Sequence, residues 1–328
     1  MKMLKRRSML AIVVAGITLF TAACGSGSNA GSSAAGSTSG TKPLLVGIVQ
    51  LQASSQFSSI QTPALKAAFE KQGWQTAVVD PNGDAAAANT AMINLIQRKA
   101  NVIVVQTFPA SALVTGMAAA KKANVPVFGT GGGPAEPGMA GSISSNAVDV
   151  MNTFMIDQLK ADPKVELLAL TFTAGPPCLA RKKGLDASLA DAPNIKVTHA
   201  PFSFPGADQI TQTATAGWLQ SHPESAGTTY ALWVCTSEGA GGIISAENQL
   251  KRGPYPLFAW DNSATAIQEI KDGTLTAVVD LPPAGTSQQL ADMIVAQQKA
   301  GNAWKMQTTV DAKAVVITKD NLAESSIK

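Results

Sequence analysis

The sequence predicts an α/β protein made of two doubly wound parallel-sheet lobes, joined by a hinge that the chain crosses several times. From residue 44 onwards, apolar runs of strand length alternate with amphipathic segments of helix length. The alternation restarts after a glycine-rich loop around residues 129–133. The chain from Lys42 on is also about twice the usual size of a single domain. Strands that alternate with helices form parallel sheets covered on both faces, so two such sets indicate two lobes.

The first lobe is expected to contain four strand–helix steps. Its strands are the apolar runs 44–49, 76–80, 101–106 and 125–129. One helix should end near Gly73, and a second should begin after Asp84, a good N-cap residue, with Met92 and Ile96 on its apolar face. A third helix runs through Met117 and Ala120.

The second lobe repeats the pattern. Its expected strands are 165–172, 195–200, 228–235 and 256–260, and its expected helices are 148–160, 184–189, 208–219 and 243–250. A strand at 274–280, a helix at 287–299 and short strands near Thr308 and Val315 are expected to return the chain to each lobe and complete both sheets. The predicted lobes are therefore 43–146 with 282–308, and 147–281 with 309–328.

The N-terminus, residues 1–23, has the pattern of an export signal. A basic segment precedes an apolar run, Met9 to Phe20, which is shorter than the about 20 residues that a membrane-spanning helix needs. The stretch TAAC resembles a bacterial lipobox, although Thr21 stands where leucine is usual. Cys24 is thus expected to become the lipidated first residue of the mature chain, and the alternative is a chance cysteine after an ordinary cleavage site.

Residues 24–42 are rich in glycine and serine and contain no apolar side chain larger than alanine between Cys24 and Lys42. Such a segment cannot bury a core, and its root-mean-square reach is about 25 Å. We therefore expect a flexible tether and an extracytoplasmic lipoprotein anchored to the cell membrane by its lipid alone.

The composition argues against several classes of protein. The chain is 45% hydrophobic and 14% charged, and its net charge of +3 shrinks once the signal is discounted, so no nucleic-acid partner is indicated. His199 and His222 lie too far apart for metal-ligand spacing, and we expect no metal.

The loop GTGGGP does not fit a nucleotide site. The pattern G-x-G-x-x-G places its third glycine on Pro134, where the helix that carries the pyrophosphate cannot begin. No Walker Gly-Lys-Ser/Thr is present, so no cofactor is expected. Ligand crevices of such sheets lie at the carboxyl ends of the strands, which makes this loop a wall of the cleft.

The same rule gives a list of candidate ligand-binding residues without any motif. They are the residues that follow the strands: Gln50, Gln52, Ser54, Ser55, Phe57, Phe108, Thr130, Gly131, Gly132, Gly133, residues 174–180, Arg181, Phe202, Phe204, Cys235, Thr236, Ser237, Glu238, Asp261, Asn262 and Asp280.

Several stretches in order resemble the type I periplasmic binding proteins, in particular the ribose-binding-like, sugar-binding branch that serves ABC importers. They are ANVPVF, AGPPCLARKKG, WLQSHPE, SEGAGG, AWD and AVVDLP, and the resemblance extends from Pro43 to Thr318. It implies that polar side chains at the strand ends hold sugar hydroxyls and that aromatic rings cover the apolar faces of the sugar. The resemblance implies that Asp261 and Asp280 accept hydrogen bonds from the sugar and that Arg181 or Lys183 donates them. It further implies that Thr236 and Glu238 line the second lobe and that the ring of Phe57 stacks on the sugar.

Each role has a structural alternative. Asp261 is alternatively the N-cap of the following helix, Asp280 a residue that fixes the hinge, and Arg181 part of a solvated helix face. The rings of Phe57, Phe202 and Phe204 are alternatively core. If Asp261 serves the ligand, Asp261→Ala should abolish binding and leave the unliganded stability nearly unchanged.

The sequence departs from the family at Gly131 and Gly132, where an Asp-Arg pair is common. Losing both groups removes charge-assisted hydrogen bonds of about 1.5 to 3 kcal/mol each. Glycines at these positions are expected to leave room for a bulkier ligand and to expose amides that an anionic group can approach. The alternative is a simple connector.

Cys178 and Cys235 both follow strands of the second lobe, and an extracytoplasmic compartment favours oxidation. We expect a disulfide, which would stabilise the chain by about 4 kcal/mol in the chain-entropy model. The alternative is a pair of buried free thiols.

These observations predict a monomeric solute-binding lipoprotein that passes a small polar ligand, a sugar or sugar derivative, to the permease of an ABC transporter. The alternatives are a ligand sensor for a membrane receptor and a binder of an amine or acidic molecule. An enzyme is not expected, because no G-x-S-x-G elbow is present and neither histidine has a recognisable nucleophile. A transcription regulator would need a DNA-binding N-terminus, where this chain has its export signal.

Overall fold

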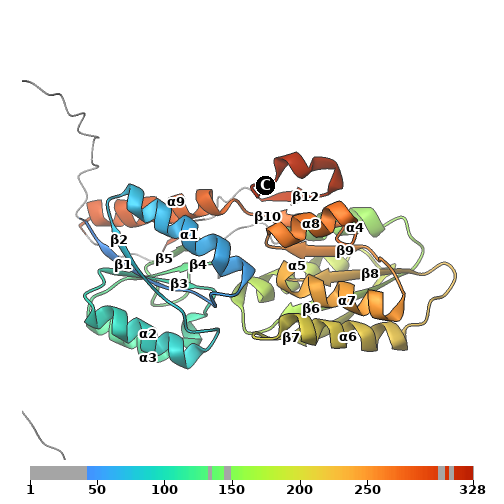
Figure 1. The fold of residues 1–328 in the computed structure, drawn as a ribbon, viewed down its shortest axis with the longest axis horizontal. Helices are drawn as coiled ribbons and strands as arrows, with labels where there is room; N and C mark the ends of the chain where they lie inside the picture. Colours follow the sequence, from blue (N-terminus) through green and yellow to red (C-terminus); the bar gives the residue numbers. More distant parts are fainter. Residues whose placement is uncertain (1–42, 132–134, 144–148, 302–306, 310–313, 328) are drawn as a thin grey trace, which may run out of the picture. The chain divides into compact units, whose positions relative to one another are not determined.

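The computed structural model describes residues 43–131, 135–143, 149–301, 307–309 and 314–327. The predicted signal peptide, the tether with Cys24, Gly132 and Gly133 lie outside these residues. The described chain forms two six-stranded, parallel-dominated sheets with flanking helices (Figure 1). The predicted α/β fold class is therefore confirmed.

The first sheet is parallel throughout. In spatial order its strands are β11 (Gln307–Thr309), β5 (Gly141–Ile143), β4 (Val127–Thr130), β3 (Val102–Gln106), β1 (Leu45–Val49) and β2 (Gln75–Val79). The strand β5 was not predicted, because Gly-Ser-Ile contains only one residue that favours a strand, whereas β11 and the equally short strand Val315–Ile317 contain two and three β-branched residues.

The second sheet has one antiparallel edge. Its spatial order is β12 (Val315–Ile317), β10 (Ala277–Asp280), β9 (Leu257–Trp260), β8 (Thr229–Val234), β6 (Val165–Phe172) and β7 (Ile195–Phe202). Only β12 runs against its neighbour β10 in this sheet. Buried strands such as β6 and β8 are nearly continuous apolar runs, as expected for a sheet covered on both faces.

Helices cover both faces of the first sheet. They are α1 (Gln56–Lys71), α9 (Pro283–Lys299), α2 (Ala85–Gln97) and α3 (Val114–Lys122), with the 3₁₀ turn η1 (Ala110–Ala112) before α3. On one face, Phe69 of α1 and Ile294 of α9 share a core with Ile48 of β1. On the other, α2 packs its Leu95 against Ile103 of β3. Asp84 caps α2 as predicted, accepting a hydrogen bond from the backbone of Ala87.

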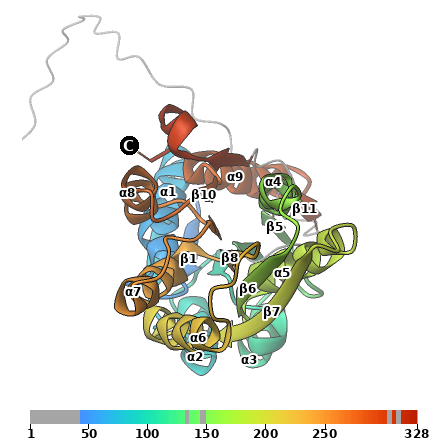
Figure 2. The ribbon, with the colours of Figure 1, turned by 90° about the vertical axis from the view of Figure 1, so that its right-hand side faces the viewer.

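The second lobe has five α-helices in the described chain: α4 (Val150–Leu159), α5 (Pro176–Leu189), α6 (Ala207–Ser221), α7 (Ala240–Leu250) and α8 (Ala264–Asp272). Two 3₁₀ segments, η3 (Ser237–Gly239) and η4 (Lys319–Glu324), belong to the same part of the chain. Helices α6 and α7 pack side by side (Figures 1 and 2). Helix α5 begins earlier than predicted, because prolines in its first turn start a helix well.

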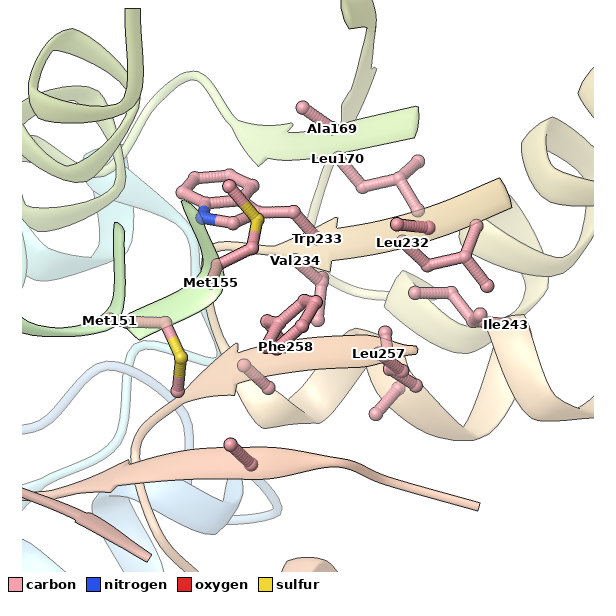
Figure 3. Packing of buried hydrophobic residues seen from close by; sticks show 14 of the residues in the cluster. Met151, Met155, Ala169, Leu170, Leu232, Trp233, Val234, Ile243, Leu257 and Phe258 are labelled. Carbon is pink, nitrogen blue, oxygen red and sulfur yellow. The ribbon is translucent and has the colours of Figure 1, made fainter. Parts of the chain in front are cut away.

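A continuous apolar core holds the second sheet to its helices. Trp233, Leu232 and Phe258 from adjacent strands lie between Met155 of α4 and Ile243 of α7 (Figure 3). All five side chains are buried, so this lobe is a rigid support for the loops at its strand ends.

The chain passes between the two sheets three times, after β5, after β10 and after β11. This agrees with a hinge of several crossings. The predicted boundary between 308 and 309 falls inside β11, all of which pairs with the first sheet. We propose the remaining predicted lobe boundaries unchanged.

Candidate functional site

A cavity of about 270 Å³ lies between the carboxyl ends of the two sheets. The predicted site residues that line it include Phe57, Thr130, Gly131, Arg181, Thr236, Glu238, Asp261 and Asp280. Phe204, in the loop between β7 and α6, also lines it. The fold thus places residues that are up to 223 positions apart in the sequence, Phe57 and Asp280, on the wall of one cavity, as the strand-end rule predicted.

Gln52 and Ser55 do not line the cavity. Gln52 donates a hydrogen bond through Nε2 to Oγ of Ser54 at 2.6 Å. Ser55 is the N-cap of α1 and accepts the amide hydrogen of Ser58 at 3.0 Å. Both residues shape the loop between β1 and α1, and α1 in turn carries Phe57.

Phe108 and Phe202 are not on the cavity wall either. Phe108 belongs to the core between the first sheet and α2, and Phe202 to the core of the second lobe. Thr107, immediately before Phe108, lines the cavity instead. The strand-end rule would have found Thr107 had it been applied one residue earlier.

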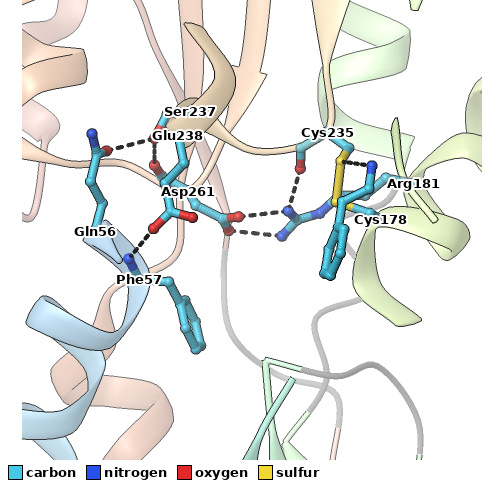
Figure 4. A network of polar contacts seen from close by, with 9 residues as sticks. Gln56, Phe57, Cys178, Arg181, Cys235, Ser237, Glu238 and Asp261 are labelled. Atoms are coloured by element: carbon cyan, nitrogen blue, oxygen red, sulfur yellow. Dashed lines mark hydrogen bonds and ion pairs between the residues drawn. A yellow bond between two sulfur atoms is a disulfide. The ribbon is translucent and has the colours of Figure 1, made fainter. Parts of the chain in front are cut away.

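The buried Arg181 and the partly exposed Asp261 form an ion pair on the wall of the cavity (Figure 4). The guanidinium donates to both carboxylate oxygens, Nη1 to Oδ2 at 2.7 Å and Nη2 to Oδ1 at 2.8 Å, and Nη1 also donates to the backbone oxygen of Cys235 at 2.6 Å. Arg181 stands 5.6 Å from the ring centroid of Trp260. Arg181 is thus not on a solvated helix face, and the carboxylate of Asp261 already has a partner.

The backbone of Asp261 is unusual. Its φ is +67°, a left-handed conformation that only glycine, asparagine and aspartate adopt readily. The N-cap of α8 is Ser263, which accepts from the amide of Ala266 at 3.0 Å. Asp261 is therefore not the helix cap, and its sharp turn directs the carboxylate toward Arg181.

Glu238 joins the two lobes. Its Oε1 accepts the amide hydrogen of Phe57, in the first turn of α1, at 3.0 Å (Figure 4). Beside it, Ser237 Oγ donates to Oε1 of Gln56 at 3.2 Å. A carboxylate at a helix N-terminus interacts favourably with the free amides and the helix dipole. Burial, with a smaller contribution from the nearby Asp261 carboxylate, nevertheless raises the pKa of the Glu238 carboxyl to about 7.

Asp280 is held by the C-terminal segment. It is buried, and its carboxylate accepts hydrogen bonds from the amide and the hydroxyl of Ser326 at 2.5 and 2.7 Å. Asn262 donates to Ser325 Oγ at 2.8 Å, which holds the same segment a second time. Ile327 consequently lines the cavity, and nothing in the sequence pattern pointed to it.

The sequence suggested that Gly131 leaves room for a bulkier ligand, but the structure shows no such room. Its φ is +68°, and a Cβ atom at this position would overlap the ring of Phe57. The space beside the glycine is therefore filled by a side chain of the protein. The glycine is needed for the close approach of α1 to the end of β4.

Cys178 and Cys235 form a disulfide in the structure. It joins the first turn of α5 to the end of β8, next to the backbone oxygen that Arg181 contacts. Phe172, the last residue of β6, donates its amide hydrogen to Cys235 Sγ at 3.2 Å. The bridge thus ties the connection after β6 to the connection after β8 at the cavity wall.

Neither a metal site nor a membrane-spanning helix is found in the described part of the chain. No group of three or more histidine, cysteine or acidic side chains there is placed to hold a metal ion. None of its helices is both long and apolar enough to cross a bilayer.

Two α/β lobes with a cavity at their facing strand ends and three chain crossings define a binding protein of the type I periplasmic architecture. The family model of the periplasmic binding protein domain matches residues 46–303, and the chain belongs to this family. A comparison with curated protein sequences finds no match.

Solved structures share the fold. A galactofuranose binding protein is 16% identical, with a TM-score of 0.74 over 87% of this chain and 97% of that one. A solute binding protein of an Agrobacterium vitis ABC transporter, with bound allitol, is 18% identical, with a TM-score of 0.75 over 86% of this chain and 98% of that one. A Mycobacterium smegmatis counterpart with bound glycerol is 24% identical, with a TM-score of 0.73 over 86% and 96%.

Proposed function

We propose that this protein is an extracytoplasmic, lipid-anchored and monomeric solute-binding protein. It captures a small ligand, a sugar or sugar derivative, between its lobes and delivers it to the permease of an ABC transporter. The observation that supports this proposal best is the cavity at the carboxyl ends of both sheets, with wall residues from both lobes. The ligands named for the structures of similar fold are sugars and polyols, which favours the same broad class here.

Ligand capture follows from hinge closure. Two lobes joined by several chain crossings rotate as bodies, and a ligand shifts the balance between open and closed forms by its extra affinity for the closed one. The Phe57–Glu238 and Gln56–Ser237 hydrogen bonds join opposite lobes, so they form only in the closed arrangement. The permease would then bind the closed surface.

A binding screen tests the proposed function. The thermal unfolding midpoint of the purified full chain is measured with sugars, polyols, amino acids and polyamines. A ligand present at a hundred times its Kd adds about 2.7 kcal/mol of stability, which raises the midpoint visibly. If no compound of any class raises the midpoint, the proposal of a solute-binding protein is overturned.

The anchor is tested separately at Cys24. Cys24→Ala should abolish incorporation of labelled fatty acid and release the protein from membranes, because the thiol is the proposed attachment site. Ser26→Ala, two residues further along, is the matched control and should remain labelled. Equal labelling of Cys24→Ala and the unaltered chain would contradict the lipid anchor.

A further inference from the structure

The walls of the cavity are largely apolar. Three phenylalanine rings from different elements face it: Phe57 of α1, Phe172 at the end of β6 and Phe204 after β7. The rings of Phe172 and Phe204 meet edge to face, with centroids 5.0 Å apart. Ile60 of α1 and Ile327 of the C-terminal segment extend this surface. A ligand in this cavity therefore contacts hydrocarbon on several sides.

The charged side chains of the wall are already bound within the protein. Asp261 receives two hydrogen bonds from Arg181, Asp280 receives two from Ser326, and Glu238 receives one from the amide of α1. A sugar hydroxyl that approaches these carboxylates must share them with these donors. Three carboxyl groups against one guanidinium also make the wall unfavourable for an anion.

Three threonine hydroxyls and the side-chain oxygen of Asn262, which also lines the cavity and has no hydrogen-bond partner in the described chain, remain for a ligand. Thr107, Thr130 and Thr236 line the cavity, and within the described chain none of their Oγ1 atoms has a hydrogen-bond partner. Each hydroxyl can donate one hydrogen bond and accept others. A pentose or hexose carries a hydroxyl on nearly every carbon, and the hydroxyls that face the phenylalanine and isoleucine side chains find no partner there. Each hydroxyl buried without a partner costs binding free energy.

Resting on the proposed function, we infer that the ligand is a neutral amphipathic molecule. Its apolar face packs against Phe57, Phe172 and Phe204, and a few oxygen atoms on its other side bind the three threonine hydroxyls. A deoxy sugar or a sparsely hydroxylated alcohol fits this description. A fully hydroxylated sugar or hexitol does not.

Matched pairs of compounds test this inference by isothermal titration of the full chain. D-galactose is compared with its 6-deoxy form, and allitol with 1,2,6-hexanetriol, which has the same six-carbon skeleton and fewer hydroxyls. In each pair the compound with fewer hydroxyls should bind about tenfold more tightly for each hydroxyl that would otherwise enter the apolar wall without a partner.

Two variants assign the contacts. Phe204→Ala should weaken the less hydroxylated partner more than the fully hydroxylated one, and Thr236→Val should weaken both. The control is Phe154→Ala, which removes a ring that packs on Phe258 and does not line the cavity. It should leave both affinities unchanged. Urea unfolding midpoints identify any variant that is simply misfolded, and Phe204→Leu then replaces Phe204→Ala.

The outcomes separate this inference from the proposed function. Tighter binding of the more hydroxylated partner in both pairs overturns the amphipathic ligand and leaves the solute-binding function standing. So does a screen in which only amino acids, polyamines or other charged compounds bind. If nothing binds in either experiment, the proposed function fails and the inference fails with it.

Discussion

Asp261→Ala is predicted to destabilise the unliganded protein strongly. The substitution removes the only carboxylate that the structure places on the guanidinium of Arg181 within the described chain. Arg181 is 7% exposed and remains charged, because arginine does not lose its proton in proteins. The backbone oxygen of Cys235 and the ring of Trp260 remain in contact with it, but neither is a counter-charge.

The magnitude has two parts. Removing the partner of a buried charge costs about 3–5 kcal/mol, and the lower end applies here because the Asp261 side chain is 21% exposed. An alanine at φ +67° adds about 1–2 kcal/mol, because its Cβ atom crowds the following carbonyl. The free energy of unfolding should therefore fall by about 4–7 kcal/mol, toward the lower end because Cys235 still accepts one hydrogen bond. Asparagine tolerates the left-handed conformation, so Asp261→Asn should cost less than Asp261→Ala.

Urea unfolding without ligand measures these values, and a double-mutant cycle isolates the pair. The double variant Arg181→Met with Asp261→Asn should lose less unfolding free energy than the two single variants lose together, because it leaves no buried charge unpaired. A loss of less than about 1 kcal/mol of unfolding free energy for Asp261→Ala would refute the structural role of the pair. Such a small loss is the outcome expected if Asp261 serves only the ligand. Additive single changes would show that the two residues are not coupled.

Three further predictions concern the closed form, the glycine and the disulfide. Burial raises the pKa of Glu238 to about 7 in the closed form, whereas an open cleft would return it toward its ordinary value near 4.5. The closed form therefore binds the Glu238 proton more tightly than the open form. This proton stabilises the closed form fully below about pH 4.5, and the stabilisation is lost as the pH rises through about 7. Ligand affinity should consequently fall from pH 5 to 8, and an equal fall for Glu238→Gln would contradict the assignment of this pH dependence to Glu238. Gly131→Ala should lower the urea midpoint more than Gly273→Ala, because both glycines have positive φ but only the first has a ring in the way of a Cβ atom; equal losses would mean that Phe57 simply moves aside. The denatured, unreduced chain should show no reactive thiol at Cys178 or Cys235, and replacing both with alanine should cost about 4 kcal/mol; two titratable thiols would exclude the bridge.

The fold could be predicted because its signals are local. Central strands such as β3, β6 and β8 are buried apolar runs, and helices such as α2 and α8 have an apolar face, so the alternation was visible along the chain. Asp84 at the start of α2 shows the same locality, since a cap depends on neighbours three residues away. Strand β5 was missed because its glycine and serine do not favour a strand.

The site could be predicted only as a set of positions. The rule that ligands bind at strand ends brought Thr236, Glu238 and Asp280 to the cavity. It could not say what each side chain binds, because the partners are distant in sequence. Arg181 and Asp261 are 80 residues apart, and Asp280 is held by Ser326, 46 residues further on. The prediction of free space beside Gly131 rested on its missing side chain, whereas in the structure the ring of Phe57 occupies that space.

Substitutions of the two cavity-wall carboxylates Asp261 and Glu238 should therefore affect different properties of the protein, its stability and its ligand affinity. The Arg181–Asp261 pair lies wholly within the second lobe, so opening the cleft leaves it intact and its loss is felt as stability. The Glu238–Phe57 hydrogen bond crosses from one lobe to the other, so it exists only while the lobes are closed. Glu238→Gln should consequently change ligand affinity and its pH dependence while leaving unfolding of the open, unliganded protein nearly unaltered. The opposite pattern, a large loss of stability for Glu238→Gln and a pure loss of affinity for Asp261→Asn, would mean that Glu238 is part of the rigid support and Asp261 part of the closing contact.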